Sequence, residues 1–195
     1  MLLEKADWIF KGSFMSVAKH SNKKTDKKVE SEYTTVTVCI RRTALVTSGG
    51  RTFRFSALVV SGDGKGRIGY GIGKAMEVPQ AIQKAVQESQ RNMVKIPLRG
   101  GTIHHEIKAS HGASDVLMMP APTGTGVIAG NAMRAVFQVL GVENVVAKSF
   151  GSCNPINVVR ATFNGLMNMK TAKSVAEKRG ISIEQVLGVK TDEQA

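Results

Sequence analysis

The sequence is poor in several residue types, and each shortage excludes a class of protein. Only two of its 195 residues are cysteines, Cys39 and Cys153, and they stand far apart in apolar stretches. Such a pair predicts buried thiols in a reducing compartment and argues against a disulfide framework. No apolar run approaches the ~20 residues that a membrane-spanning helix needs. Aromatic residues make up 5% of the chain, too few for a platform that stacks single-stranded nucleic acid.

Acidic residues are scarce as well. The chain carries 27 Lys and Arg against 15 Asp and Glu, a net charge of +12 at pH 7. Between Tyr33 and Gly62 there is no acid at all, but there are four arginines, Arg41, Arg42, Arg51 and Arg54. This excess favours a polyanionic partner, with nucleic acid ahead of an anionic membrane surface. The membrane alternative lacks a strongly amphipathic basic helix with aromatic anchors.

Apolar residues form 42% of the chain, which is enough for a real core. In the first half, strand signals cover 34–42, 52–61 and 67–72. Within the second of these, Phe53, Phe55, Ala57 and Val59 share one face by period two. A helix follows with Pro79 in its first turn. The cations expected to share one face of that helix are Lys84, Arg91 and Lys95.

Beyond a short junction at 97–101, strands and helices alternate. Strand-like runs cover 102–108, 116–119 and 145–150. One helix is expected to end near Leu140, and another to start at Asn154-Pro155, where an N-cap residue is followed by proline. The pattern predicts an α+β protein. Its expected parts are a flexible basic extension over 1–32, a first domain over 33–97, a second domain over 101–188 and a tail over 189–195.

The most informative stretch, residues 49–74, contains two glycine-rich turns flanked by cations. It has no nucleophile, base or set of metal ligands nearby. Bare backbone amides beside Arg and Lys suit a crowded phosphate backbone. We therefore predict an RNA-contact surface that recognises backbone and shape, and no catalytic residues. The candidate contact residues are Arg42, Gly49, Gly50, Arg51, Arg54, Gly64, Lys65, Gly66, Arg67 and Lys74.

Two glycine motifs imitate a dinucleotide fingerprint. The first, Gly64-x-Gly66-x-x-Gly69, precedes a strand where the fingerprint needs a helix. The second, Gly124-x-Gly126-x-x-Ala129, lies between a strand and a helix but lacks the acid expected about twenty residues later. Because this second motif has the right strand–turn–helix context, a nucleotide-dependent enzyme that uses this turn is the competing function. A helix N-terminus offered to an RNA phosphate, or close packing of the turn, fits this second motif better.

A group of potential metal ligands, His104, His105, Glu106 and His111, also needs an interpretation. Adjacent histidines on a strand point to opposite faces, and no cysteine lies close in sequence. We therefore expect neither a metal site nor a cofactor. The polar residues Ser149, Ser152 and Asn154 are expected to serve a loop and a helix cap.

Two long motif blocks resemble the bacterial-type small-subunit ribosomal protein S5 family. The first block is GRxxxFxAxxVxGDxxGxIGxG over 50–71 with KAxEVPxA over 74–81. The second is GTGVIAGxAMRA over 124–135 with AKSxGSxNPxNVVRAT over 147–162. The similarity extends over about 38–188.

The resemblance implies a double-stranded-RNA-binding-like βββα first domain and an α/β second domain of the S5 domain-2-like type. It implies a non-enzymatic constituent of the cytoplasmic small ribosomal subunit that binds small-subunit rRNA beside ribosomal proteins S4 and S8, and not a homo-oligomer. It also implies roles in subunit assembly, at the head–body hinge near the mRNA entry side, and in decoding accuracy.

Several positions depart from the residues that are usual in the family. These are Leu45 and Ser48 in place of Lys, Asp115 at a commonly basic position near the S4 contact, Ser61 in place of an apolar residue and Asn131 in place of Gly.

Overall fold

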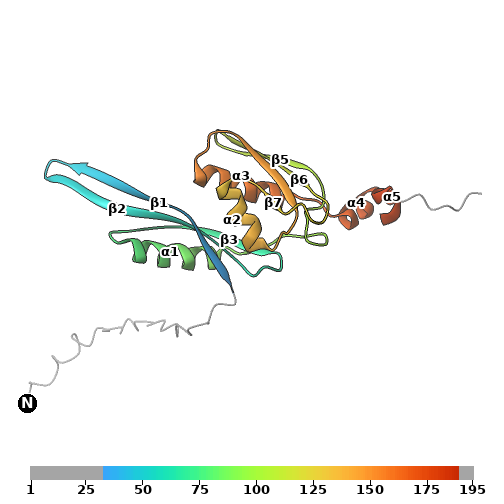
Figure 1. Cartoon of the computed structure of the whole chain (residues 1–195), viewed down its shortest axis with the longest axis horizontal. Coiled ribbons are helices and arrows are strands. Elements are labelled where there is room, and N and C mark those ends of the chain that lie inside the picture. Colours follow the sequence, from blue (N-terminus) through green and yellow to red (C-terminus); the bar gives the residue numbers. More distant parts are fainter. Residues whose placement is uncertain (1–32, 189–195) are drawn as a thin grey trace, which may run out of the picture. The chain divides into compact units, whose positions relative to one another are not determined.

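The computed structural model describes residues 33–188, which form two four-stranded sheets and five helices (Figure 1). The predicted extension over 1–32 and tail over 189–195 lie outside the described residues. No helix within 33–188 is long and apolar enough to cross a membrane.

The first sheet is antiparallel, with strand order β1-β2-β3-β4. Its strands are β1 (Thr34–Thr47), β2 (Gly50–Gly62), β3 (Arg67–Ala75) and β4 (Val94–Lys95). All three predicted strands are confirmed, and each is longer than predicted. Helix α1 (Val78–Arg91) carries proline in its first turn, as expected. The prediction that Lys95 shares a helix face with Lys84 and Arg91 is wrong, because Lys95 lies in β4, whose two residues are too few to show a period.

The centre of β2 is buried on both sides. Ala57 packs with Ala75 and Ala81 beneath α1, while Leu58 and Val60 belong to a larger cluster on the opposite face. One side of the sheet therefore rests on α1, and the other side contributes to a core shared with the second half of the chain.

Helix α1 lies directly on a row of glycines in β3. A Cβ atom at Gly71 would stand 2.6 Å from the Ser89 nitrogen, and one at Gly73 would stand 2.6 Å from the Ala85 nitrogen. Neither distance leaves room for a side chain. The alternate glycines of β3 therefore allow backbone to pack on backbone, with small residues on the helix side at Ala81, Ala85 and Ser89.

The second sheet has strand order β5-β6-β8-β7, in which only β7 and β8 are parallel. Its strands are β5 (Ile107–His111), β6 (Ser114–Pro120), β7 (Val127–Ile128) and β8 (Val145–Gly151). The predicted strand over 102–108 is wrong for its first five residues, which form a loop. Helices α2 (Asn131–Leu140) and α3 (Pro155–Met167) confirm the prediction, whereas α4 (Ala172–Arg179) and α5 (Ile183–Leu187) were not predicted.

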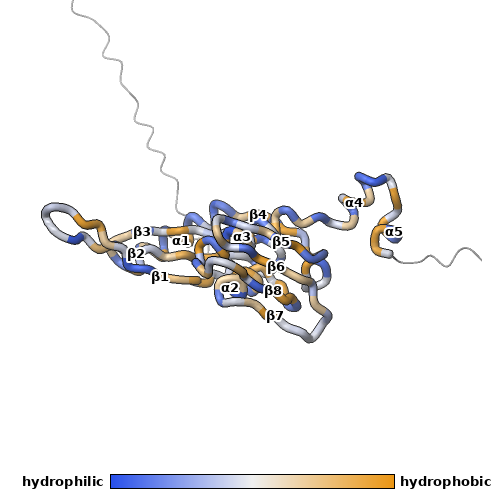
Figure 2. Tube along the Cα trace, turned by 90° about the horizontal axis from the view of Figure 1, so that it is seen from above, coloured by the Kyte–Doolittle hydropathy of each residue, from blue (hydrophilic) through white to orange (hydrophobic). Residues whose placement is uncertain are grey.

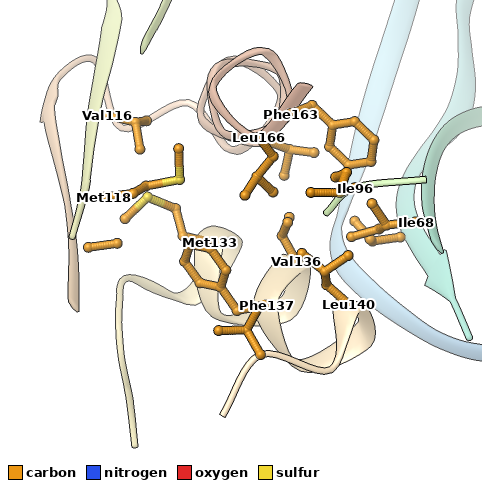
Figure 3. Packing of buried hydrophobic residues seen from close by; sticks show 14 of the residues in the cluster. Ile68, Ile96, Val116, Met118, Met133, Val136, Phe137, Leu140, Phe163 and Leu166 are labelled. Carbon is orange, nitrogen blue, oxygen red and sulfur yellow. The ribbon is translucent and has the colours of Figure 1, made fainter. Parts of the chain in front are cut away.

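One hydrophobic core joins the two sheets (Figure 3). Ile68 and Ile96 from the first half lie beside side chains of α2 and α3, including Leu140 and Phe163. The ring of Tyr70 on β3 packs edge to face on that of Phe163, with centroids 4.8 Å apart. The described residues 33–188 accordingly belong to a single compact unit by their contacts.

Candidate nucleic-acid interface

The β1–β2 hairpin extends beyond the part of the sheet that α1 covers (Figure 1). Its strands pair without interruption at the far end, from Arg41 opposite Ser56 to Thr47 opposite Gly50. Every residue from Ile40 to Arg54 is exposed. A two-stranded ribbon is marginal in water by itself, and this one is continuous with the sheet that α1 covers.

One face of the hairpin base gathers cations from three strands. Arg41 lies opposite Ser56, which in turn lies opposite Lys74 on β3, and Arg54 stands in the next row opposite Thr43. Directly paired residues share a sheet face, so these three side chains leave the sheet on the same side. Arg41 was absent from the predicted contact residues, because only the register across three strands places it beside Lys74.

The other face of the hairpin combines arginines with apolar side chains. Arg42 lies opposite Phe55, and Val46 lies opposite Arg51. The guanidinium carbon of Arg42 stands 3.7 Å from the centroid of the Phe53 ring, within the range of a cation–π interaction. At the turn, Gly50 has a φ of +132°, a conformation that glycine adopts far more readily than other residues.

The loop between β2 and β3 differs from its prediction. The amides of Gly64 and Gly66 donate to the carbonyl oxygens of Val139 and Leu140 at 3.1 and 3.2 Å. A Cβ at Gly66 would also stand 2.9 Å from the carbonyl oxygen of Ile96. The interpretation of these amides as bare phosphate ligands is therefore wrong, since they hold the loop against the end of α2.

The carboxylate of Asp63 engages the remaining amides of this loop. Its Oδ1 accepts hydrogen bonds from the amides of Lys65 and Arg67 at 2.8 and 2.9 Å. Burial by itself raises the pKa of Asp63, but the amide hydrogen bonds from Arg67 and Lys65 outweigh it, so the pKa lies below its usual range. The Lys65 and Arg67 side chains remain exposed.

The ten predicted contact residues therefore divide into two groups. Six lie on the hairpin and the adjoining end of β3, namely Arg42, Gly49, Gly50, Arg51, Arg54 and Lys74. Four lie at the opposite end of the sheet, in the loop before β3 and at its first residue, namely Gly64, Lys65, Gly66 and Arg67. Arg67 and Lys74 are seven positions apart on β3, a distance of about 23 Å at the usual rise of a strand.

The second glycine motif is also held internally. The amides of Gly124 and Gly126 both donate to Oδ1 of Asn144, at 3.0 and 3.1 Å. Asn144 is itself buried, and its carbonyl oxygen accepts from the Thr102 hydroxyl at 2.7 Å. Close packing does not account for these glycines, since nothing lies within 4 Å of a Cβ placed at either one. Their φ angles of +93° and +74° do, because glycine adopts such a conformation far more readily than other residues.

Comparison with known proteins agrees with the motif blocks. The family model "Ribosomal protein S5, N-terminal domain" matches residues 33–97, and "Ribosomal protein S5, C-terminal domain" matches residues 109–179. The chain belongs to the ribosomal protein S5 family. Members of the S5 family are structural components of the ribosome and not enzymes.

Individual S5 proteins are similar over most of their length. The small ribosomal subunit protein uS5 of Coxiella burnetii is 64% identical over 150 residues, covering 77% of this chain and 89% of the relative. The uS5 protein of Alcanivorax borkumensis is 60% identical over 77% of this chain and 90% of the relative. That of Ectopseudomonas mendocina is 54% identical over 83% and 98%.

In this S5 family member, His105 holds the loop that precedes β5. The residues 104 and 105 lie in a bend, so the argument from opposite strand faces does not apply. The amide of Lys170 donates to Nε2 of His105 at 3.2 Å, and Nδ1 of His105 lies 2.7 Å from the Glu106 carbonyl oxygen. Burial, followed by the charges of Arg99 and His105, lowers the pKa of His104. Residues 33–188 contain no group of three potential ligands placed to hold a metal ion.

The residues expected to serve a loop and a helix cap do so only in part. The Ser152 hydroxyl accepts from the Asn154 amide at 3.4 Å, and its carbonyl accepts from the Ser114 hydroxyl at 2.6 Å. Asn154 occupies the N-cap position of α3, but its side chain makes no capping hydrogen bond. Its buried Oδ1 has no partner. The start of α3 therefore depends on Pro155 and on packing more than on its cap.

Proposed function

We propose that this chain binds small-subunit rRNA as a structural constituent of the small ribosomal subunit, chiefly through the β1–β2 hairpin. The observation that carries the proposal is the hairpin itself. It is exposed from Ile40 to Arg54, carries four arginines and has no acidic residue on either strand. Such a ribbon repels cationic partners and attracts a phosphate backbone.

The row of cations at the hairpin base suits a phosphate strand. Arg41, Arg54 and Lys74 lie on one face within two adjacent rows of the ladder. Strands are about 4.8 Å apart, so Arg41 and Lys74, on either side of β2, start about 10 Å apart, and Arg54 projects from β2 between them. Contacts of this kind position a protein on RNA without reading its sequence.

The exposed side chains of Lys65 and Arg67 supply a second contact in this proposal. Arg67 lies opposite Lys95 of β4, so two cations share that end of the sheet. At about 23 Å from the hairpin base, this second group reaches a different backbone segment. The sheet would then span two parts of the rRNA, as expected for recognition of folded RNA by shape.

Membership in the S5 family supports the finer parts of the proposal. In it, the three strands and α1 act as a double-stranded-RNA-binding-like domain over 33–97, and 101–188 acts as an α/β domain of the S5 domain-2-like type. The protein would lie beside ribosomal proteins S4 and S8 in the cytoplasmic small subunit, near the mRNA entry side. There it would support assembly, the head–body hinge and decoding accuracy.

A charge-matched pair of triple variants tests the hairpin. We expect Arg41→Gln with Arg54→Gln and Lys74→Gln to weaken binding to a small-subunit rRNA fragment and to flatten the dependence of log K on log salt by about 2 units, at 0.7–0.9 per lost phosphate contact. The control changes Lys84, Lys108 and Lys173 to Gln, which removes the same charge from exposed positions elsewhere. If the two variants lost equal affinity for the rRNA fragment, only net charge would matter, and this result would contradict the proposal.

Incorporation into the subunit is tested separately. In a sucrose gradient at moderate and then high salt, the chain should co-migrate stoichiometrically with small subunits, as followed by mass spectrometry. A large free pool at the top of the gradient would contradict a structural role.

A further inference from the structure

The two faces of the β1–β2 hairpin differ in chemistry. One carries Arg41, Arg54 and Lys74, as described above. The other carries exposed apolar side chains beside its arginines, with Ile40, Val46 and Phe53 exposed by 45%, 68% and 43%. Figure 2 shows hydrophobic segments along the far part of this hairpin. The first face also exposes Leu45, by 59%, but the second face holds an arginine against an aromatic ring, a contact that a phosphate strand does not explain.

The centre of this second face is the Arg42–Phe53 pair. The register places the small Ala44 opposite Phe53, and Arg42 one row away, close enough for a long side chain to reach a diagonal neighbour. The guanidinium accordingly lies over the ring, 3.7 Å from its centroid. Both residues are exposed, so the side of the guanidinium away from the ring is open to a ligand.

A guanidinium held in this way has two free binding features. Its N–H groups lie in the plane and can donate to phosphate or base edges. Its open side can stack on a nucleobase, as arginine planes do in sequence-specific RNA recognition. No carboxylate on β1 or β2 competes for the charge, because neither strand contains an acidic residue.

We infer that the Arg42–Phe53 pair is a stacking site for the base of one unpaired nucleotide. The inference rests on the proposed rRNA binding and adds a base contact to it. A base within a continuous duplex is covered by its neighbours, so the ligand is a bulged or looped-out nucleotide. Phe53 is then a positioning residue, since it orients the arginine that touches the base.

Three RNA probes and three variants test the site. The probes are an uninterrupted duplex, the same duplex with one bulged adenosine, and that duplex with an abasic nucleotide at the bulge. We expect the wild type to bind the adenosine bulge about tenfold more tightly than the abasic bulge, within the range for stacking of one base. Arg42→Lys keeps the charge and removes the plane, and Phe53→Leu keeps an apolar side chain and removes the ring. Each should reduce the preference to about one, with an unchanged salt dependence on the uninterrupted duplex.

The matched control is Arg41→Lys, the same exchange on the opposite face, which should retain the tenfold preference. If the wild type binds the adenosine and abasic bulges equally, or if Arg42→Lys retains the preference, the stacking site is wrong while rRNA binding stands. Failure of the wild type to bind any of the probes or a small-subunit rRNA fragment would instead refute the proposed function, and the stacking site with it. Should Phe53→Leu unfold, Arg42→Lys decides the question alone.

Discussion

The hydroxyl oxygens of Ser61 and Ser89 lie 2.5 Å apart in the interior, where β2 meets α1. Both residues are fully buried. The Ser89 hydroxyl already donates its single proton to the Val86 carbonyl oxygen at 2.8 Å. Ser61 is therefore the donor in the pair, and Ser89 is both its acceptor and a donor to the helix backbone.

This assignment predicts an asymmetric mutant cycle. Ser89→Ala leaves the buried Ser61 hydroxyl without an acceptor and should cost about 1–3 kcal/mol of unfolding free energy. Ser61→Ala leaves Ser89 still bonded to Val86 and should cost less. The double variant should be more stable than Ser89→Ala alone, because no unpaired donor remains. Chemical denaturation of the four proteins measures the cycle, and strictly additive effects would contradict the assignment.

The glycine row beneath α1 predicts a severe effect of a single methyl group. Gly71→Ala should destabilise the protein by at least about 3 kcal/mol, because its Cβ would meet backbone atoms of Ala85 and Ser89 that cannot move independently of the helix. Gly49→Ala is the matched control, since nothing lies within 4 Å of a Cβ placed there. Thermal unfolding compares them, and similar melting temperatures would contradict the close packing.

The lowered pKa of Asp63 predicts a pH-dependent contribution to stability. Its pKa in the folded protein lies below the value of about 3.9 expected when unfolded. The contribution is therefore complete above about pH 4 and disappears as the pH falls through the folded pKa. The difference in unfolding free energy between the wild type and Asp63→Asn should be present at neutral pH and shrink below pH 4.

Asp115→Asn is the control for this prediction, since it removes an exposed carboxylate on β6. The measurement is urea denaturation from neutral pH down to about pH 3. A wild-type-to-variant difference that stays constant over that range would show that the Asp63 carboxylate does not hold the loop.

The hydrogen bonds of Asn144 predict a local effect on the turn that precedes β7. Asn144→Ala removes the acceptor of two amides and should cost about 1–3 kcal/mol. Hydrogen exchange at Gly124 and Gly126 should accelerate more than exchange elsewhere in the second sheet. Gln138→Ala, at an exposed position of α2, should leave those two amides unchanged. Unaltered exchange in Asn144→Ala would contradict the role of its side chain.

Local patterns predicted most of the strands and helices correctly. Thr34–Arg42 and Thr52–Ser61 are rich in β-branched and apolar residues, and Pro79 marks the start of α1. Such signals are local, because they arise from steric preferences within a few residues. The two residues of β4 escaped prediction because so short a strand forms only when a neighbouring strand supplies its partners.

The candidate interface was predicted in part. The arginine-rich, acid-free segment is visible in the sequence, since charge is a property of each residue. Its division into two groups and the place of Arg41 beside Lys74 depend on strand register. The amides of Gly64 and Gly66 were misinterpreted because their acceptors, Val139 and Leu140, lie more than 70 positions away in the chain.

The amino-acid sequence by itself determined the family, the basic character and the order of most elements. It did so because motif identity, charge and hydrophobic period are each contained in short stretches of chain. Tertiary structure alone decided what the glycines do. The glycines of β3 and of the turns around Gly64 and Gly124 look alike in sequence, yet the first accept a helix and the others hydrogen-bond to distant residues. Glycine permits close approach without specifying the partner, and the partner is set by the packing of segments far apart in the chain.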